Sequence, residues 1–182
     1  MSGGLLFSNY FNMKEEIINR VALSPLISLD LAEFYPEGER LVYDLKDNLY
    51  QGMILREKDF REFAKNHDWS QYAGKNVAIV CSAEAIVPTW AYMLLAAHLR
   101  PFARYFVFGD LAALEQALFQ EKIAQIDPEI YRDKKIVVKG CGDLPIPTFA
   151  YVALTQKLLP VVASLMFGEP CSTVPLYKRP KG

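Results

Sequence analysis

The sequence predicts an α/β fold with three layers, in which a mostly parallel sheet carries helices on both faces. Two observations predict it. The chain matches itself when one copy is shifted by 59 residues, and short apolar runs alternate with stretches of helical periodicity. Strands that alternate with helices pair in parallel through right-handed crossovers. We therefore expect an internal duplication of a strand-helix-strand-helix unit.

The shifted match runs without a gap and places residues 55–95 on residues 114–154. Its identical pairs are Leu55/Leu114, Phe60/Phe119, Glu62/Glu121, Asp68/Asp127, Tyr72/Tyr131, Lys75/Lys134, Pro88/Pro147, Thr89/Thr148, Ala91/Ala150, Tyr92/Tyr151 and Leu95/Leu154. Similarity at a fixed spacing indicates repeated structural units. We interpret residues 40–99 and 104–167, to within a few positions, as the two halves.

The N-terminal part of the chain precedes the repeat. Residues 1–12 lack periodicity and are expected to be an irregular extension. Residues 13–35 are predicted to hold an amphipathic helix and then a short edge strand, with Ser24-Pro25 ending the helix because proline disfavours a helical residue before it. Residues 41–45 alternate between apolar and polar side chains, which predicts another strand.

Each half then contains two helices and a buried strand. The first helices are predicted at residues 55–66 and 110–125, the second one capped by Asp110. Short apolar runs predict strands at residues 77–80 and 136–138 and a further strand at residues 105–108.

The second helix of each half should begin at a proline. Pro88-Thr89 and Pro147-Thr148 mark these starts, because proline is tolerated in a first helical turn. The second of these helices is expected to bend or divide at Pro160 and to stop at Gly168. Residues 168–182 are then predicted to be an extended tail, packed on the body by Val174, Leu176 and Tyr177.

Length and composition set outer limits on the function. A chain of 182 residues predicts one domain with a shared core. A net charge of -1 without a basic patch argues against nucleic-acid binding. No apolar run is long enough for a membrane span or a signal peptide, so we expect a cytoplasmic protein. The apolar fraction of 52% suggests self-association, and we predict a homodimer.

The candidate site lies where two predicted parallel strands end. Cys81 and Cys141 follow these strands directly, at the edge where open parallel sheets bind ligands. An acid follows each cysteine, Glu84 in the first half and Asp143 in the second. Gly140 and Gly142 flank Cys141 and would let backbone N–H groups approach a ligand closely. If the strands are neighbours, thiols and carboxylates converge on one pocket.

A metal site is one interpretation of these residues. Cys81, Cys141 and Cys171 could hold zinc or iron, with a carboxylate or His98 completing the shell. The spacing does not show the close ligand pairs typical of structural zinc sites. Free cysteines are also often buried as small hydrophobic residues. Cys171 joins the other two only if the chain breaks at Pro160, if the tail folds back, or if a second subunit contributes.

Cysteine-based catalysis is a further alternative, with Cys141 as the nucleophile. No histidine is placed beside a cysteine by the sequence, because His67 and His98 fall at helix ends and are interpreted as surface or internally bonded residues. The repeated aromatic pairs, Trp90/Phe149 and Tyr92/Tyr151, are expected in the core. Asp68 and Asp127 are interpreted as turn residues that bond local backbone N–H groups.

Several of these segments together resemble a known family. They are Asn-His-Asp-Trp-Ser-Gln-Tyr72, Cys-Ser-Ala-Glu-Ala-Ile-Val-Pro-Thr-Trp-Ala-Tyr92, Val-Phe-Gly-Asp110, Val-Lys-Gly-Cys141 and Gly-Glu-Pro-Cys-Ser-Thr-Val-Pro-Leu-Tyr177. The chain is similar, from residue 13 to residue 179, to the Bacteroidetes family known as domain of unknown function 2480. The resemblance implies no assigned activity. It does imply a genomic neighbourhood of iron-sulfur assembly genes, and hence iron-sulfur assembly proteins as partners.

Three hypotheses follow from the sequence, and whether the protein is an enzyme stays open. The first is an accessory in metal or iron-sulfur and sulfur handling, with a thiolate-carboxylate site. The second is a non-enzymatic interaction or scaffold module with structural cysteines. The third is a hydrolase or transferase that uses a cysteine nucleophile.

Overall fold

The computed structural model describes residues 26–140, 142–169 and 171–180. The predicted N-terminal helix and Cys141 lie outside these ranges. The strands of the described residues form two sheets, so our prediction of a single sheet is wrong. The first sheet has the parallel order β2 (Arg40–Asp44), β3 (Asn76–Val80) and β4 (Tyr105–Phe108). The second has the order β1 (Leu26–Leu29), β5 (Lys135–Val138), β6 (Ser164–Glu169) and β7 (Ser172–Lys178), with only β7 antiparallel.

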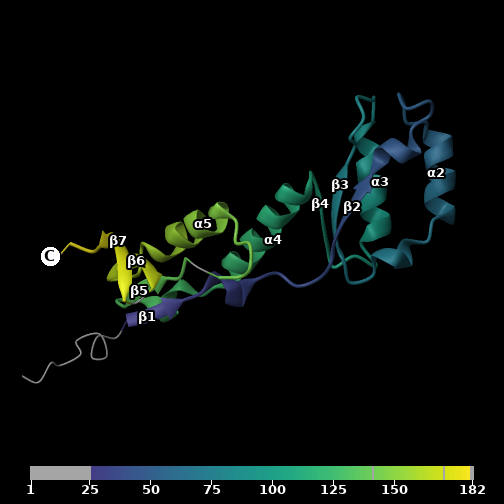
Figure 1. Ribbon diagram of the computed structural model, residues 1–182. Helices are drawn as coiled ribbons and strands as arrows, with labels where there is room; N and C mark the ends of the chain where they lie inside the picture. The colour runs from purple at the N-terminus through teal and green to yellow at the C-terminus, as the bar shows by residue number, and fades with distance from the viewer. Residues whose placement is uncertain (1–25, 141, 170, 181–182) are drawn as a thin grey trace, which may run out of the picture.

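The two sheets lie toward opposite ends of an elongated molecule (Figure 1). They separate because β1 pairs with β5 and leaves β2, its neighbour in sequence, to pair with β3. The second sheet therefore takes its edge strand from the chain before the first sheet and its other strands from the chain after it. The described fold is α/β with parallel pairing, as predicted.

Two helices cover one face of the first sheet. The elements around this sheet are η2 (Leu45–Asn48), α2 (Glu57–Asn66), η3 (Trp69–Tyr72) and α3 (Thr89–Leu99). Phe60 of α2 and Leu95 of α3 share a buried cluster with Val77 and Ile79 of β3. Because strand side chains alternate between faces, these two β3 residues define the face that α2 and α3 cover.

Helix α4 (Leu111–Gln125) connects the two sheets. Its Leu114 and Leu118 pack on Ala78, which points to the opposite face of the first sheet. Its Phe119 and Ile123 belong to the core of the second sheet. Helix α4 therefore has buried residues on two sides, as expected of a helix that packs against more than one partner. The buried residues of α2, in contrast, lie along one side only.

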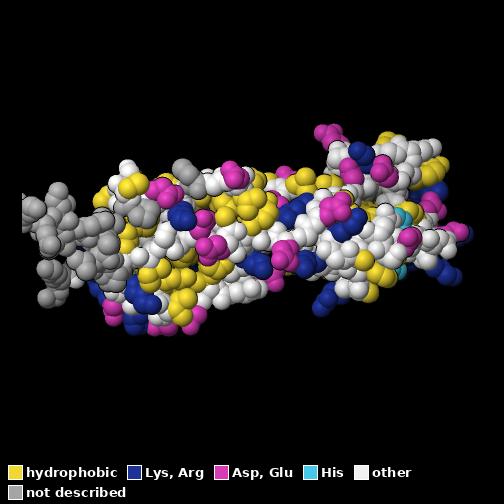
Figure 2. Space-filling model, turned by 60° about the horizontal axis from the view of Figure 1, so that its bottom comes forward, with side chains coloured by type: hydrophobic (Ala, Val, Ile, Leu, Met, Phe, Trp, Pro, Cys, Tyr) yellow, Lys and Arg dark blue, Asp and Glu magenta, His cyan; other side chains and the backbone are white. Residues whose placement is uncertain are grey.

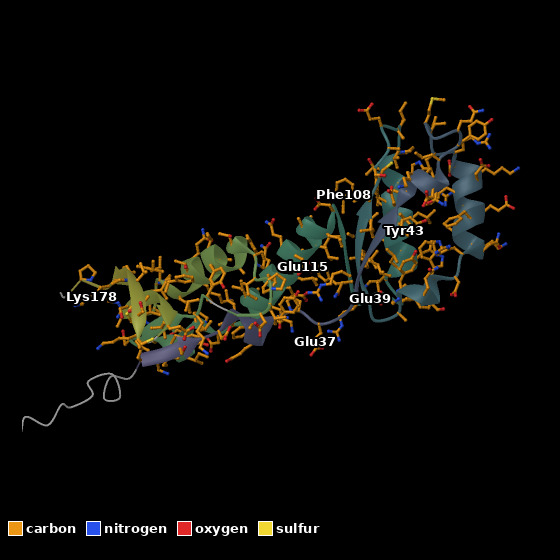
Figure 3. The ribbon with its side chains drawn as sticks, in the orientation of Figure 1. Glu37, Glu39, Tyr43, Phe108, Glu115 and Lys178 are labelled. Carbon is orange, nitrogen blue, oxygen red and sulfur yellow. The ribbon has the colours of Figure 1, made fainter. Side chains whose placement is uncertain are left out.

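An ion pair adds to this connection. The guanidinium of Arg40 in β2 contacts the carboxylate of Glu115 in α4 at 2.6 Å, and Glu115 projects from α4 in Figure 3. Arg40 also lies over the ring of Tyr35, 5.1 Å from its centroid. The ion pair thereby ties the start of β2 to α4.

The second sheet is covered by α4 and by α5 (Thr148–Leu158), with η1 (Leu31–Phe34) and η4 (Pro128–Tyr131) at its ends. Several local predictions are confirmed around both sheets. Helices α3 and α5 begin directly after Pro88 and Pro147. Asp68 accepts a bond from the Ser70 N–H, and Asp127 does the same at η4. Asp110 caps α4.

The end of the chain differs from the prediction. Helix α5 ends at Leu158, and β6 begins at Ser164, within the stretch that was expected to continue the helix after Pro160. Gly168, the predicted end of the helix, lies inside β6. The predicted extended tail is the strand β7, paired along β6. Val174 and Leu176 are exposed rather than packed on the body, whereas Tyr177 packs on the second core. The periodicity of residues 161–168 was too short to distinguish a helix from a buried strand.

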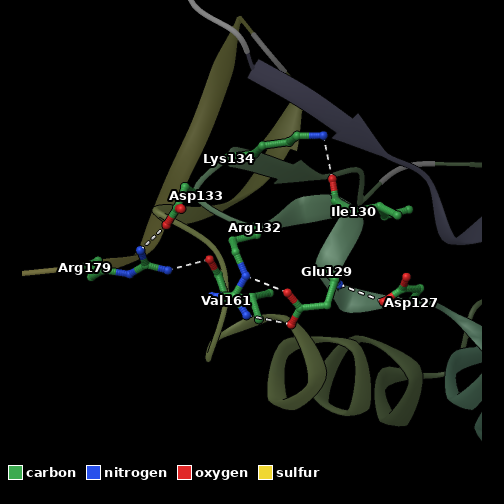
Figure 4. A network of polar contacts seen from close by, with 8 residues as sticks. All are labelled: Asp127, Glu129, Ile130, Arg132, Asp133, Lys134, Val161 and Arg179. Atoms are coloured by element: carbon green, nitrogen blue, oxygen red, sulfur yellow. Dashed lines mark hydrogen bonds and ion pairs between the residues drawn. The ribbon is translucent and has the colours of Figure 1, made fainter.

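Arg179 fixes the end of β7. Its guanidinium contacts the Asp133 carboxylate and the Val161 carbonyl oxygen (Figure 4). Beside this contact, Arg132 donates two bonds to Glu129, at 2.5 and 2.7 Å. No helix within the described ranges has both the length and the apolar character to cross a bilayer.

Candidate functional site

The first sheet has an open groove at the carboxyl ends of its strands, the position where parallel sheets usually bind ligands. The groove has a volume of about 590 Å³. It lies between the ends of β2 and β3 and the start of α4. Its lining residues are Val42, Asp44, Lys46, Val80, Cys81, Ser82, Asp110, Leu111 and Ala112.

Asp44 organises this groove. One carboxylate oxygen accepts the backbone N–H groups of Lys46 and Ser82, and the other accepts the Ser82 hydroxyl at 2.5 Å. Burial opposes ionisation of Asp44, but the bonds from Ser82 and Lys46 outweigh it and lower the pKa of the carboxyl to about 2. Asp44 is therefore charged and locally bonded, and it fixes the loop after β3.

Cys81 lies in the groove with little polar contact. The side chain is half-buried, and its Sγ donates a weak bond to the Ala83 carbonyl oxygen at 3.6 Å. Tyr92 packs on the same core cluster as Cys81, and its pKa is raised by burial and then by the charges of Cys81 and Asp44. No histidine lines this groove. Activation of the thiol by an adjacent imidazole therefore has no support among the described residues.

Exposed apolar side chains border the groove. Phe108, at the end of β4, exposes 72% of its surface and touches Tyr92 edge to face at 5.1 Å. Leu111 and Val42 are exposed on either side. Figure 3 shows Phe108 at the tip of its strand, beside the start of α4. A group of exposed apolar side chains such as these three is typical of a binding surface.

The second sheet has a smaller pocket at the matching place, of about 170 Å³. Asp30 lines it and, like Asp44, accepts a backbone N–H two residues on, at 2.9 Å. The Lys139 ammonium lies 3.6 Å from the Asp30 carboxylate. Gly140 and Gly142, both predicted as ligand-binding residues, line this pocket.

The remaining predicted site residues do not gather in one place. Glu84 and Asp143 are exposed and line neither pocket. Cys171 is exposed in the turn between β6 and β7 of the second sheet, whereas Cys81 belongs to the first. The structure thus brings neither Cys171 nor the glycines beside Cys141 into the pocket of Cys81. Within the described ranges, no three His, Cys, Asp or Glu residues are arranged to hold a metal ion.

A third pocket, of about 290 Å³, was missed by sequence reasoning. It is lined by Val42, Tyr43, Asp44, Asp47, Asn48, Phe63, His67 and Tyr72. His67 lies among aromatic rings, with centroids 4.7 Å from Phe63 and 4.6 Å from Trp69. Burial lowers its pKa, against the opposing charge of Asp68. In the sequence, the close succession of His67, Trp69 and Tyr72 is the signal that could have predicted this aromatic pocket.

His98 joins this cluster as well. Its ring stacks on Trp69 with centroids 4.9 Å apart. The rings of Tyr43 and Trp69 are also stacked, at 6.1 Å. The sequence predicted His98 as a surface or internally bonded residue at a helix end, and did not predict the aromatic cluster that β2, η3 and α3 assemble around it.

Comparison with known proteins gives a family but no function. Residues 15–179 match the family model described as Protein of unknown function (DUF2480). The chain belongs to this family. Neither the curated proteins nor the solved structures contain a match to it. The resemblance inferred from the sequence is confirmed at the level of the family.

In this DUF2480 chain, the groove and the aromatic pocket adjoin each other. They share Val42 and Asp44, and both residues belong to β2. Within the described chain, β2 is an edge strand that pairs only with β3. The two pockets therefore border the same open sheet edge.

Proposed function

We propose that this protein is an interaction module that binds an extended segment of a partner protein along the edge of β2. The observation that carries the proposal is the pair of pockets that share Val42 and Asp44 on that edge. Segments that add to a sheet edge gain affinity from main-chain hydrogen bonds and specificity from pockets for alternate side chains.

The backbone of β2 has the direction that such addition needs. The N–H of Asn76 donates to the carbonyl oxygen of Glu39 at 2.8 Å, so Glu39 and the residues two and four positions later face β3. Backbone groups alternate in direction along a strand. The N–H and C=O of Val42 therefore point away from β3, toward the open edge.

The side chains around the edge define the partner's chemistry. Val42 and Leu111 supply an apolar wall, next to the exposed Phe108. Asp47 and Asp110 add negative charge beside the two pockets. The occupant that fits is an extended peptide with an apolar side chain for the groove and a Lys or Arg facing these acids.

Selection of displayed random peptides on the full-length protein provides the probe for a test. The best peptide is synthesised with a fluorophore, and its Kd is measured by anisotropy. Val42→Pro removes the outward N–H and is expected to weaken binding by about tenfold or more. The matched Val42→Thr, which keeps both the N–H and the branched shape, should change Kd by less than about threefold.

N-methylation of the peptide gives a second readout that leaves the protein unchanged. Strand addition uses the N–H groups of alternate residues. One alternating set of N-methylated positions should therefore abolish binding, and the other set should be tolerated. Equal tolerance of both sets would overturn the proposal, as would selected peptides without an apolar and a basic residue.

The hypothesis of metal or iron-sulfur handling is tested separately. It would require donors beyond Cys81, since the described residues form no group of three metal ligands. Elemental analysis of purified protein, with thiol alkylation before and after chelation, tests it. Metal that protects the thiols would favour this function over the interaction module. A single fast-reacting thiol without metal would instead favour cysteine catalysis.

We further infer that the two units arose by duplication. The 59-residue spacing supports this, because η3 and η4, β3 and β5, and α3 and α5 all begin 59 residues apart. The predicted homodimer remains a proposal, and sedimentation of the purified chain tests it.

A further inference from the structure

The second sheet has a face that none of the described core clusters includes. Leu29, Ile136 and Val138 point toward α4 and α5 and belong to the second core. Side chains alternate along strands, so Val137 and its register neighbour Met166 point the other way. Val137 is fully buried, yet it appears in no cluster formed by the described residues.

A groove of about 460 Å³ lies on this side of the sheet. Met166, Pro175 and Tyr177 contribute apolar surface to it, and Lys178 and Arg179 stand at its rim. Figure 2 shows hydrophobic side chains, with Lys and Arg beside them, over the half of the molecule that holds this sheet. The groove is large enough to accept several side chains of a docking segment.

The corresponding face of the first sheet is covered by a helix. Ala78 precedes Val137 by 59 residues and lies beneath Leu114 and Leu118 of α4. Ala78 and Val137 are therefore buried apolar residues at the same point of an interior strand in each sheet, and on the first sheet α4 covers this point.

The groove lies at the end of the sheet where β1 begins. β1 starts at Leu26 and is parallel to β5 and β6, so Leu26 is level with Lys135 and Ser164 at the start of those strands. Ser164 itself lines the groove. A helix of about 12 residues is about 18 Å long, and four strands spaced at about 4.8 Å span about 15 Å. A segment of this length crosses the whole sheet.

The chemistry of the segment matches the groove. Residues 13–24 have helical periodicity, with Ile17, Ile18 and Val21 on one side and Glu15 and Glu16 in the first turn. The apolar side chains suit the floor of the groove, and the two acids suit its basic rim. We propose that residues 13–24 of this chain dock on the outer face of the second sheet, in the role that α4 has on the first.

A disulfide-trapping experiment tests this in the full-length chain. Ile18→Cys and Met166→Cys are combined in a background in which the three native cysteines are serines. Mild oxidation should join them within one chain, which is detected by mass spectrometry and by faster migration on a non-reducing gel. The control pair, Ile18→Cys with Val152→Cys on the exposed side of α5, should stay reduced. A disulfide-linked dimer, or equal trapping of both pairs, would overturn the proposal.

Methionine oxidation gives an independent measurement. Ile17→Glu with Ile18→Glu should expose Met166 and raise the rate of its oxidation by peroxide several-fold over that of the otherwise unaltered chain. Met53 and Met93, both exposed in the first unit, serve as internal controls whose rates should not change. An unchanged Met166 rate would contradict docking of this segment.

Discussion

The ring of Phe167 occupies the space where a β-carbon on Gly140 would stand, because that atom would lie 2.1 Å from Cζ of the ring. At the matching position of the first unit, 59 residues earlier, the residue is Cys81 and the ring is Phe108. Phe108 is exposed to 72%, whereas Phe167 is exposed to 36%. The absence of a side chain at Gly140 thus lets Phe167 lie against its sheet.

Gly140→Ala is therefore expected to push the Phe167 ring outward, toward the exposure of Phe108. The ring would lose its edge-to-face contact with Tyr151, whose centroid is 5.7 Å away. Such contacts contribute about 0.5–1.5 kcal/mol, and urea unfolding should show a loss of about 1 kcal/mol. Gly142→Ala, with nothing within 4 Å of the added atom, is the control and should cost less.

Asp44→Asn should destabilise the protein by about 1–2 kcal/mol at pH 7, because it removes charge-assisted bonds to Ser82 and Lys46. The folded pKa of Asp44 is lowered to about 2. Its contribution is therefore present above the unfolded value of about 3.9 and is lost as pH falls toward 2. Urea unfolding at pH 7 and at pH 3 measures the difference, which should shrink at pH 3.

The nearby exposed Asp47 provides a matched control for this prediction. Asp47→Asn should change the free energy of unfolding by less than about 0.5 kcal/mol. A loss equal to that of Asp44→Asn would show that the bonds to Ser82 and Lys46 are not the cause.

His67 should make stability depend on pH in the neutral range. Burial lowers its folded pKa below the ordinary value, so the unfolded chain binds the proton more readily. The free energy of unfolding should then fall as pH drops below about 6.5. His67→Phe keeps a ring beside Phe63 and Trp69 but removes the titration. Chemical unfolding across pH 5 to 8 would contradict the assignment if the variant kept the same slope.

Asn76→Ala should cost about 1–3 kcal/mol, since it removes the hydrogen bond that a fully buried amide donates and leaves a small cavity in its place. Asn76 is the single buried polar side chain of the described core, and its amide donates to the Glu37 carbonyl oxygen at 2.8 Å. Its Oδ1 has no partner among the described residues. Urea unfolding measures the loss. Asn66→Ala, at an exposed amide that also bonds a backbone carbonyl, should cost less.

Much of the local structure was predictable from the sequence. The starts of α3 and α5 followed from Pro88 and Pro147, and the turns at Asp68 and Asp127 followed from their side-chain chemistry. These rules act over a few residues, so no knowledge of distant contacts was needed.

The match of the sequence with itself at a spacing of 59 residues extends beyond residues 95 and 154. Extending the same 59-residue spacing pairs Leu99 with Leu158, Pro101 with Pro160 and Phe108 with Phe167. Because residues 105–108 were correctly predicted as a strand, this extension would have predicted β6 in place of a continued helix.

The candidate site was predicted only in part. Cys81, Gly140 and Gly142 do line strand-end pockets, yet in two different sheets. The aromatic pocket around His67 was not anticipated, because Tyr43 and His67 come from separate elements and approach only when β2 and α2 pack together.

The sequence by itself determined where most helices and strands begin, because capping residues, prolines and apolar periodicity act locally. Only the tertiary structure decided that β1 joins β5 and that α4 is shared by two sheets. Parallel strands of similar composition can pair in several orders, and the choice depends on how apolar faces are buried across the whole chain. Because this burial places Cys81 and Gly140 in different sheets, two separate strand-end pockets form in place of the single pocket that we predicted.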